Sequence, residues 1–239
     1  MKATLALGLA VAAFLLFPGA FAPLLSPFAP AAGPVIYDRA SIPGLAAAHL
    51  ALVAAALVPS ALLGIGFAIW VTRPSQQQAL PLARAVVNFG QTLPPVAVLA
   101  ICVPIFGFGA VPTLVALFLY GLLPIFESAL AGLLDVPESV RTSATAVGLS
   151  PAQRLGRVEL PLAAPLILEG LRLSAVISLS TATIGSTVAG RTLGEIIIAG
   201  LNSNNLAFVL QGGLLTAALA LLIHAGFGAL IEVSRRPPT

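Results

Sequence analysis

The chain consists of long apolar stretches separated by short polar connectors. A transmembrane α-helix needs about 20 consecutive, mostly apolar residues. Stretches of suitable length are predicted as membrane-spanning helices at residues 3–25, 45–71, 87–107, 111–134, 164–189 and 207–233. The pattern therefore predicts an all-α, polytopic membrane protein with about six transmembrane helices.

Composition and charge agree with this prediction. The chain is 59% hydrophobic and 8% charged, whereas soluble domains carry about 25% charged residues. Its mean hydropathy is +1.06 and its pI is near 9.8. The largest basic cluster is Arg235-Arg236, so no nucleic-acid-binding surface is predicted. We interpret the separate positive charges as topology signals, which orient the chain in the lipid membrane.

The positive charges fall mainly on one side of the predicted topology. If Lys2 is cytoplasmic, alternating spans place nine of the 11 Lys and Arg residues inside and only Arg39 and Arg191 outside. The residues placed inside are Lys2, Arg73, Arg84, Arg141, Arg154, Arg157, Arg172, Arg235 and Arg236. By the positive-inside rule, both termini are expected on the cytoplasmic side of the membrane.

The first span has an alternative interpretation. Lys2, the apolar stretch that follows and Ala20-Phe21-Ala22 are also typical of a secretory signal with its cleavage site. Residues 1–25 are thus either a transmembrane helix or a signal-like segment. Residues 26–44 are proline-rich and predicted as an external loop, and residues 45–239 as one transmembrane domain.

The sequence offers no catalytic chemistry. A phosphate-binding P-loop requires a lysine, and the only lysine is Lys2, so the chain is not expected to bind ATP itself. His49 and His224 each lie in an apolar run without other ligand types, which favours packing or hydrogen bonding between helices over metal binding. The single cysteine, Cys102, forms no metal or disulfide motif. No catalytic residue, metal site or cofactor is predicted.

Residues 135–161 form the one well-defined polar connector. Asp135 and Glu138 are spaced as a capping box with Pro137 in the first turn, which predicts a short helix that ends at Gly148. Ser150, Pro151 and Gln153 predict a second capped helix that Pro161 terminates. On this second helix, Leu155 and Val158 are expected on one face, and Arg154 and Arg157 on another.

The spacing within this connector resembles a known motif. Gly148, nine residues and then Val158-Glu159-Leu160-Pro161 are similar to the EAA loop of ABC importer permeases. The Glu-Ala-Ala that begins the family pattern falls here on Thr142-Ser143-Ala144, so the usual glutamate is missing. The chain also resembles osmoprotectant permeases, most closely the Yeh type, over about residues 45–232. Four segments carry this resemblance: 90–97, 104–109, 119–125 and 182–184.

This resemblance implies the permease subunit of a type I importer. Such an importer has two permease subunits, identical or homologous, two cytoplasmic ATPases that bind ATP and Mg, and a periplasmic or extracellular substrate-binding protein. Its implied substrates are glycine betaine, choline and related osmoprotectants, and the EAA loop implies a coupling helix at residues 150–160 that binds the ATPase. The residues implied in coupling are Gly148, Ser150, Arg154, Leu155, Arg157, Val158 and Pro161.

Two other functions stay open. The permease could serve another small solute, such as an amino acid or a sulfonate, or the chain could be an ion-coupled secondary transporter, which would be expected to show an internal repeat. Candidates for a translocation path lie in the fifth span at helical spacing, although small polar residues also pack helices together. These candidates are Ser174, Ser178, Thr181 and Thr183.

Two shorter patterns carry further expectations. Glu169 and Arg172 are three residues apart, which predicts a local ion pair. Residues 193–201 are apolar but too short to span a membrane, and the sequence Asn202-Ser203-Asn204-Asn205 predicts a turn or helix cap behind them. This short segment is either a half-inserted gate helix or a surface helix without a gating role.

Overall fold

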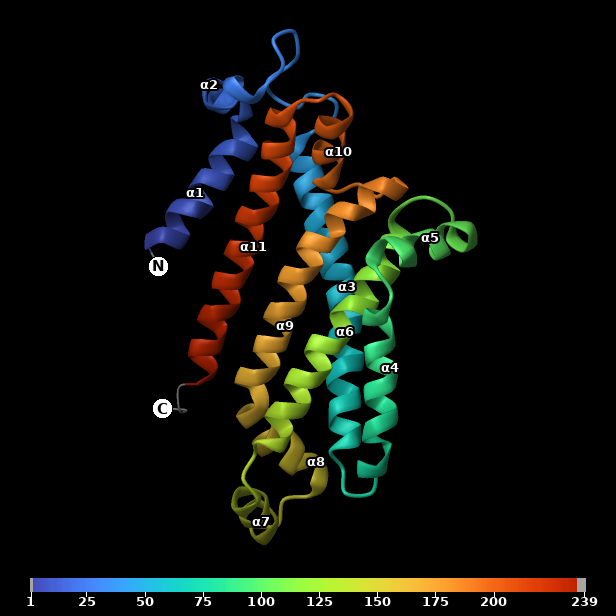
Figure 1. Ribbon diagram of the computed structural model, residues 1–239. Helices are drawn as coiled ribbons and strands as arrows, with labels where there is room; N and C mark the ends of the chain where they lie inside the picture. Colours follow the sequence, from blue (N-terminus) through green and yellow to red (C-terminus); the bar gives the residue numbers. More distant parts are fainter. Residues whose placement is uncertain (1, 236–239) are drawn as a thin grey trace. The chain divides into compact units, whose positions relative to one another are not determined.

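The computed structural model describes residues 2–235, and within them the secondary structure is entirely helical (Figure 1). This confirms the all-α prediction. The α-helices are α1 (Lys2–Leu16), α2 (Ala22–Leu25), α3 (Ile42–Val71), α4 (Leu80–Thr92), α5 (Pro95–Phe106), α6 (Ala110–Leu134), α7 (Glu138–Ala146), α8 (Pro151–Arg154), α9 (Leu160–Ala182), α10 (Gly194–Asn202) and α11 (Leu206–Ser234).

Four helical runs of the described chain are long and apolar enough to cross a membrane on their own. They are α3, α6, α11 and the continuous run Pro151–Val188, which includes α8 and α9. Two broken helix pairs bring the number to six if each pair counts as one span. The predicted number of about six spans therefore holds only when the broken pairs are included.

The spans predicted at 3–25 and 87–107 are not straight helices. In the first, Lys2–Leu16 and Pro18–Phe28 are bent by 110°. In the second, α4 ends before Leu93 and Pro94, whose ψ angles of 133° and 143° are extended. Proline has no N–H and disfavours helical angles at the residue before it. Hydrophobicity alone did not reveal these breaks, because apolar length does not report helix continuity.

The chain divides into two compact units, which are described separately. Within the described residues, the first contains residues 2–56, Pro94–Leu117 and Ala175–Ala225. Its buried core includes the side chains of Leu45, Leu179, Ile196 and Phe208, from α3, α9, α10 and α11. His49 lies in this core, where Nε2 is 3.0 Å from the Leu179 carbonyl and Nδ1 is 3.2 Å from the Leu193 N–H. The prediction that His49 makes hydrogen bonds between helices is confirmed.

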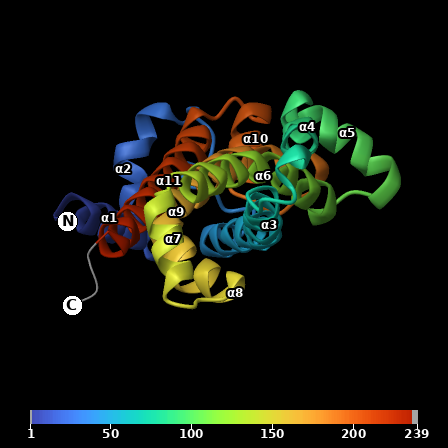
Figure 2. The ribbon, with the colours of Figure 1, turned by 90° about the horizontal axis from the view of Figure 1, so that it is seen from below.

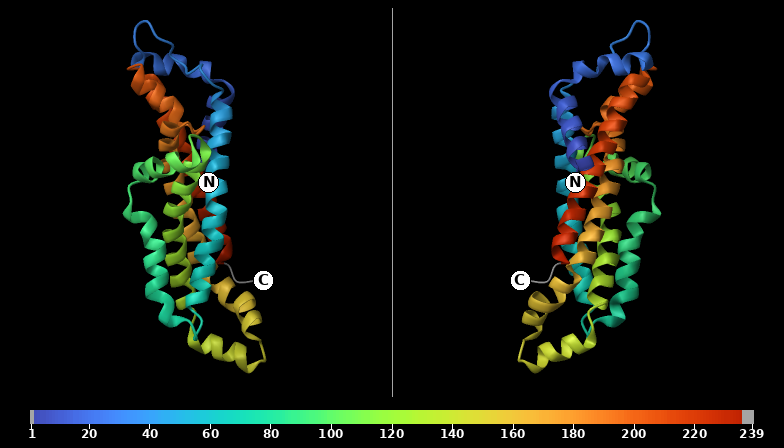
Figure 3. Two further views of the ribbon diagram at one scale, coloured as in Figure 1. Left: turned by 90° about the vertical axis from the view of Figure 1, so that its right-hand side faces the viewer. Right: turned by 90° about the vertical axis from the view of Figure 1, so that its left-hand side faces the viewer.

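Within the described residues, the second unit contains Leu57–Leu93, Phe118–Ser174 and residues 226–235. Its core includes Val87 of α4, Phe126 of α6 and Ala163 of α9. Figure 3 shows α7 and α8 beyond the ends of α6 and α9. This unit therefore presents the polar connector at the ends of closely packed apolar helices.

Polar side chains in the second unit stabilise its helices at specific points. Pro124 has no N–H for the Tyr120 carbonyl one turn earlier, and the Gln91 side chain donates to that carbonyl at 3.1 Å. The Arg84 side chain binds both carboxylate oxygens of Glu127, at 3.0 and 3.2 Å. No local sequence pattern indicated this pair between α4 and α6, because its residues are 43 positions apart.

Candidate functional site

The connector between α6 and α9 begins with a correction to the predicted capping box. The N–H of Asp135 donates to Ala131 at 2.9 Å, so this residue closes the last turn of α6. Pro137 is the N-cap of α7, and no side chain caps that helix. The prediction that Asp135 caps the first connector helix is therefore wrong, because its backbone is still part of the preceding helix.

The glycine turn and the second capping box are confirmed. Gly148 has a φ of +84°, in the left-handed region that favours glycine. The Leu149 N–H donates to the Ala144 carbonyl at 3.1 Å and closes the end of α7. Ser150 Oγ accepts from the Gln153 N–H at 3.3 Å, and Gln153 Oε1 accepts from the Ser150 N–H at 2.9 Å. The start of α8 is thus fixed by its own sequence.

Pro161 does not end this second helix, contrary to the prediction. Residues Leu155–Glu159 form a π-helical segment that joins α8 to α9, so the helix runs on through Pro161. The Leu160 N–H donates to the Leu155 carbonyl, five residues earlier. A π turn shifts the hydrogen-bond register and so accommodates a proline that provides no N–H. The helix predicted at 150–160 is instead the first part of the run Pro151–Val188, which is long and apolar enough to cross a membrane, and its coupling role stays a prediction.

The π segment also changes which side chains share a face. Arg157 is exposed, whereas Arg154 is partly buried. Leu155 packs against the core of the second unit, and Val158 is partly buried. The arginines predicted on one face therefore have different environments, because α-helical spacing does not hold across residues 155–159.

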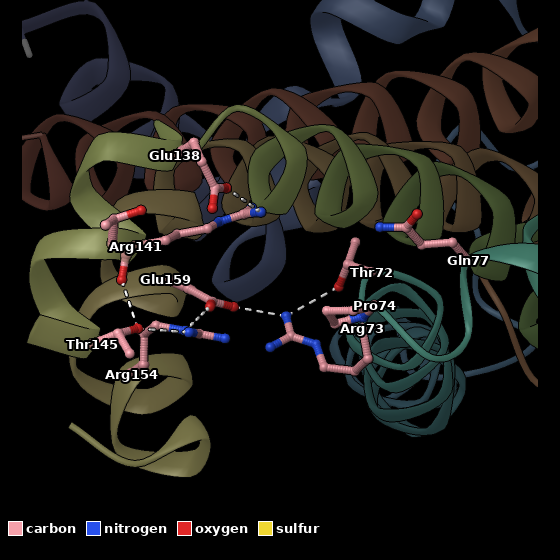
Figure 4. Close-up of a pocket in the computed structure, with 10 residues that line it drawn as sticks. Thr72, Arg73, Pro74, Gln77, Glu138, Arg141, Thr145, Arg154 and Glu159 are labelled. Carbon is pink, nitrogen blue, oxygen red and sulfur yellow. Dashed lines mark hydrogen bonds and ion pairs between the residues drawn. The ribbon is translucent and has the colours of Figure 1, made fainter. Parts of the chain in front are cut away.

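Glu159 is the central residue of the site that these elements form (Figure 4). Its side chain is only 2% exposed, and its two carboxylate oxygens bind different arginines. Arg73, which follows α3, donates to Oε2 at 2.7 Å, and Arg154 donates to Oε1 at 3.0 Å. These two charge-assisted hydrogen bonds connect the end of α3 with α8 and the π segment.

A cavity of about 420 Å³ lies beside this ion pair cluster. The cavity contains three arginines and two glutamates, and hence an excess of one positive charge at neutral pH. Thr142, where the EAA pattern has glutamate, also lines it. The lining residues are Thr72, Arg73, Pro74, Gln77, Glu138, Arg141, Thr142, Thr145, Arg154 and Glu159.

The contacts of the cavity residues hold α7 on α8. Arg154 donates a second hydrogen bond, at 3.0 Å, to Thr145 Oγ1 of α7. Arg141 donates to the Leu133 carbonyl and lies 3.8 Å from Glu138. Figure 2, viewed from the connector side, shows α7 and α8 as neighbouring segments joined by a short turn. The connector is therefore a defined structure with a polar surface.

Sequence reasoning missed Glu159 as the centre of this site. Arg73 is 86 residues away from it in the chain. Arg154 is five residues away, which is not a spacing that pairs side chains in an α-helix. Neither partner could be recognised from local sequence. The predicted local pair of Glu169 and Arg172 is present and confirmed.

The proposed path residues have different exposures. Ser174 and Ser178 are 0% and 1% exposed, inside the helix packing. A β-carbon on Gly121 would come within 2.7 Å of Ser174 Oγ, so α6 and α9 approach closely there. Thr181 and Thr183 are partly exposed. Of the four predicted path residues, only these two threonines therefore have exposed surface in this structure.

Comparison with known proteins gives the family. The profile of the family described as "binding-protein-dependent transport system inner membrane component" matches residues 64–232. The chain belongs to this family. It is therefore a transport subunit and not an enzyme. Residues 2–63, which include α1, α2 and the first part of α3, precede the matched region.

Two characterised relatives have similar sequences. The chain is 38% identical over 175 residues to the osmoprotectant import permease protein OsmY of Salmonella typhimurium, covering 73% of this chain and 74% of the relative. It is 34% identical over 175 residues to the choline transport system permease protein OpuBB of Bacillus subtilis, covering 73% of this chain and 80% of the relative.

Solved ABC transporters have a similar fold. A chain of the inward-facing MetNI methionine transporter matches with a TM-score of 0.71 and 21% identity, covering 79% of this chain and 94% of that chain. A chain of an amino acid ABC transporter matches with a TM-score of 0.60 and 18% identity, covering 80% of this chain and 90% of that chain. At these identities the likeness shows the fold, which agrees with the predicted type I permease fold.

Proposed function

We propose that this chain is the permease subunit of an ATP-driven importer that moves osmoprotectants, such as glycine betaine or choline, across the bacterial cytoplasmic membrane. The names of the similar relatives, osmoprotectant and choline permeases, support the substrate class. The observation that carries the coupling role is the continuous helical run from α8 into the transmembrane part of α9. A partner that binds α8 acts directly on a membrane-spanning helix.

The proposed coupling acts through the connector. A cytoplasmic ATPase, which binds ATP and Mg, contacts the surface of α7 and α8, including the exposed Arg157. Movement of α8 passes along the continuous helical run into α9, and through Glu159 to Arg73, which follows α3. Two membrane-spanning helices thus receive the same displacement. A second permease subunit, identical or homologous, completes the pathway.

The charge distribution supports a cytoplasmic connector. Arg73, Arg141 and Arg154, which the sequence places on the inside, line one cavity. We assign α10 to the external side, because the helical run that begins with α8 is long enough to cross a membrane. We place the end of α11 on the cytoplasmic side, and Arg236 lies outside the described residues.

The solute path is proposed along α9 and the turn that follows it. Thr181 and Thr183 offer partly exposed hydroxyls, and Ser174 and Ser178 would join them only if the helices separate during transport. The tight selection of a quaternary ammonium solute, which usually needs an aromatic cage, is assigned to the substrate-binding protein. The permease then needs only a wet, weakly polar passage.

Uptake by the reconstituted importer tests this proposal. The permease, its ATPase and the substrate-binding protein are placed in liposomes, and labelled glycine betaine, choline and carnitine are supplied outside with ATP inside. Uptake of one of these solutes that stops when the ATPase is omitted is expected. Uptake driven by an ion gradient without ATP would show a secondary transporter, and ATP-driven uptake restricted to amino acids or sulfonates would overturn the substrate class.

A further inference from the structure

The external proline-rich loop that precedes α3 is held in place by buried side chains of the first unit. Asn205 Nδ2 donates to the Pro34 carbonyl at 2.8 Å, and Gln211 Nε2 donates to the Val35 carbonyl at 2.8 Å. Gln211 Oε1 also accepts from the Tyr37 N–H at 3.1 Å. Asn205 and Gln211 are both buried. Three hydrogen bonds to successive parts of the loop backbone thus fix its path.

Tyr37 connects this loop to α10. Its side chain is buried, and its hydroxyl donates to Glu195 Oε1 of α10 at 2.8 Å. Its ring packs edge-on against Phe208 of α11, with 5.4 Å between ring centroids. A second contact comes from α3, where His49 Nδ1 accepts a hydrogen bond from the N–H of Leu193, the residue just before α10. The position of α10 is therefore set by the loop and by α3 together.

The segment next to Tyr37 is exposed. Asp38 and Arg39 follow it directly with exposed side chains, and residues 30–32 of the loop are exposed as well. A loop that is already ordered loses little conformational entropy when a partner binds. Exposed charges of both signs on such a loop favour a partner with complementary charges.

The segment 30–39 lies outside the region that the family profile matches, yet it contacts an element inside that region. We propose that residues 30–39 form part of the docking surface for the external substrate-binding protein, and that the contact between Tyr37 and Glu195 transmits docking to α10. This inference rests on the proposed function, because the partner is the substrate-binding protein of the proposed importer. The partner is a soluble protein, because the proposed topology assigns this segment to the external side of the membrane.

The packing of α10 connects the proposed docking surface with the proposed solute path. Gly194, the first residue of α10, lies so close to the preceding turn that a β-carbon there would be 1.9 Å from the Thr183 carbonyl. Thr183 is one of the two partly exposed threonines proposed to contact solute. A shift of α10 must therefore displace this part of the path.

The docking surface is tested by removing its charges. Purified complexes in liposomes are titrated with the substrate-loaded binding protein that supports uptake by the wild type, and ATP hydrolysis is measured. With Asp38→Ala and Arg39→Ala combined, the concentration for half-maximal stimulation is expected to rise about fivefold or more, with basal hydrolysis unchanged. The matched control combines Glu232→Ala and Arg235→Ala, which removes an exposed acid and an exposed arginine from the end of α11. The proposed docking surface would be overturned if both pairs of substitutions raised the half-maximal concentration equally, or if the loop pair did not raise it.

The transmission step is tested separately with Tyr37→Phe. This variant keeps the ring against Phe208 and loses only the hydroxyl, so the half-maximal concentration is expected to stay unchanged while maximal stimulation falls. Glu195→Gln keeps an acceptor for Tyr37 and is expected to retain most of the stimulation. Full stimulation of Tyr37→Phe would refute the transmission step. A wild-type complex that no binding protein stimulates would instead refute the proposed function.

Discussion

Replacing Glu159 with glutamine is expected to loosen the connector without unfolding the protein. The glutamine has nearly the same volume, so the packing around the site is kept. It loses the negative charge that Arg73 and Arg154 share at 2.7 and 3.0 Å. Its amide nitrogen, a donor, also takes the place of one carboxylate oxygen, an acceptor. This nitrogen then faces an arginine, which can only donate. The variant therefore keeps an acceptor for one arginine only, and neither arginine has a negative charge beside it.

The expected loss follows from burial. Breaking a buried ion pair by removing one partner costs about 3–5 kcal/mol. Here the carboxylate is 2% exposed, but the arginine side chains are 25% and 23% exposed, so water can solvate them in the variant. We therefore expect the lower limit, about 3 kcal/mol, which is about a hundredfold in the equilibrium for local opening.

Hydrogen exchange of the assembled importer measures this opening. Backbone amides of residues 152–160 are expected to exchange about a hundredfold faster in Glu159→Gln than in the wild type. The matched control is Glu138→Gln, the same substitution in the same connector, where the carboxylate is 82% exposed and 3.8 Å from Arg141. No change is expected in the control. An increase of less than about threefold in Glu159→Gln would show that the ion pairs do not hold α8.

Three further predictions concern other positions. Gly148→Val should leave membrane insertion intact but weaken copurification of the ATPase, since valine at a φ of +84° costs about 1–2 kcal/mol; normal copurification and transport would contradict this. Gly170→Ala should lower the thermal midpoint, because its β-carbon would lie 2.6 Å from Cβ of Ser128, whereas Gly156→Ala, with no atom within 4 Å, should have a smaller effect. Burial and the hydrogen bond to Glu195 raise the pKa of Tyr37 from 10.0 to about 12. The folded state thus favours the protonated hydroxyl of Tyr37. The difference in thermal unfolding midpoint between wild type and Tyr37→Phe should therefore be constant below pH 10 and shrink as the pH rises toward 12.

Several features of the site could be predicted because their causes are local. The capping box of Ser150 and Gln153 involves residues three apart, and the Gly148 turn depends on the conformation of one residue. The pair of Glu169 and Arg172 follows from helical spacing. In each case the interacting groups are adjacent in sequence, so the sequence alone specifies the geometry.

The remaining features depend on contacts between distant segments or on competition between local signals. Pro161 is a helix terminator by local rules, but the π segment before it lets the helix continue. The carboxylate of Glu159 is stabilised by Arg73, which is 86 residues away, and Tyr37 meets Glu195 across 158 residues.

By itself, the sequence determined an all-helical membrane protein with a capped, glycine-hinged connector, because hydrophobic length and caps are local properties. Only the tertiary structure decided that this connector continues into a membrane-spanning helix, and that a buried carboxylate joins it to α3. Burial makes that carboxylate depend on its two arginines, and burial is established only when the helices pack.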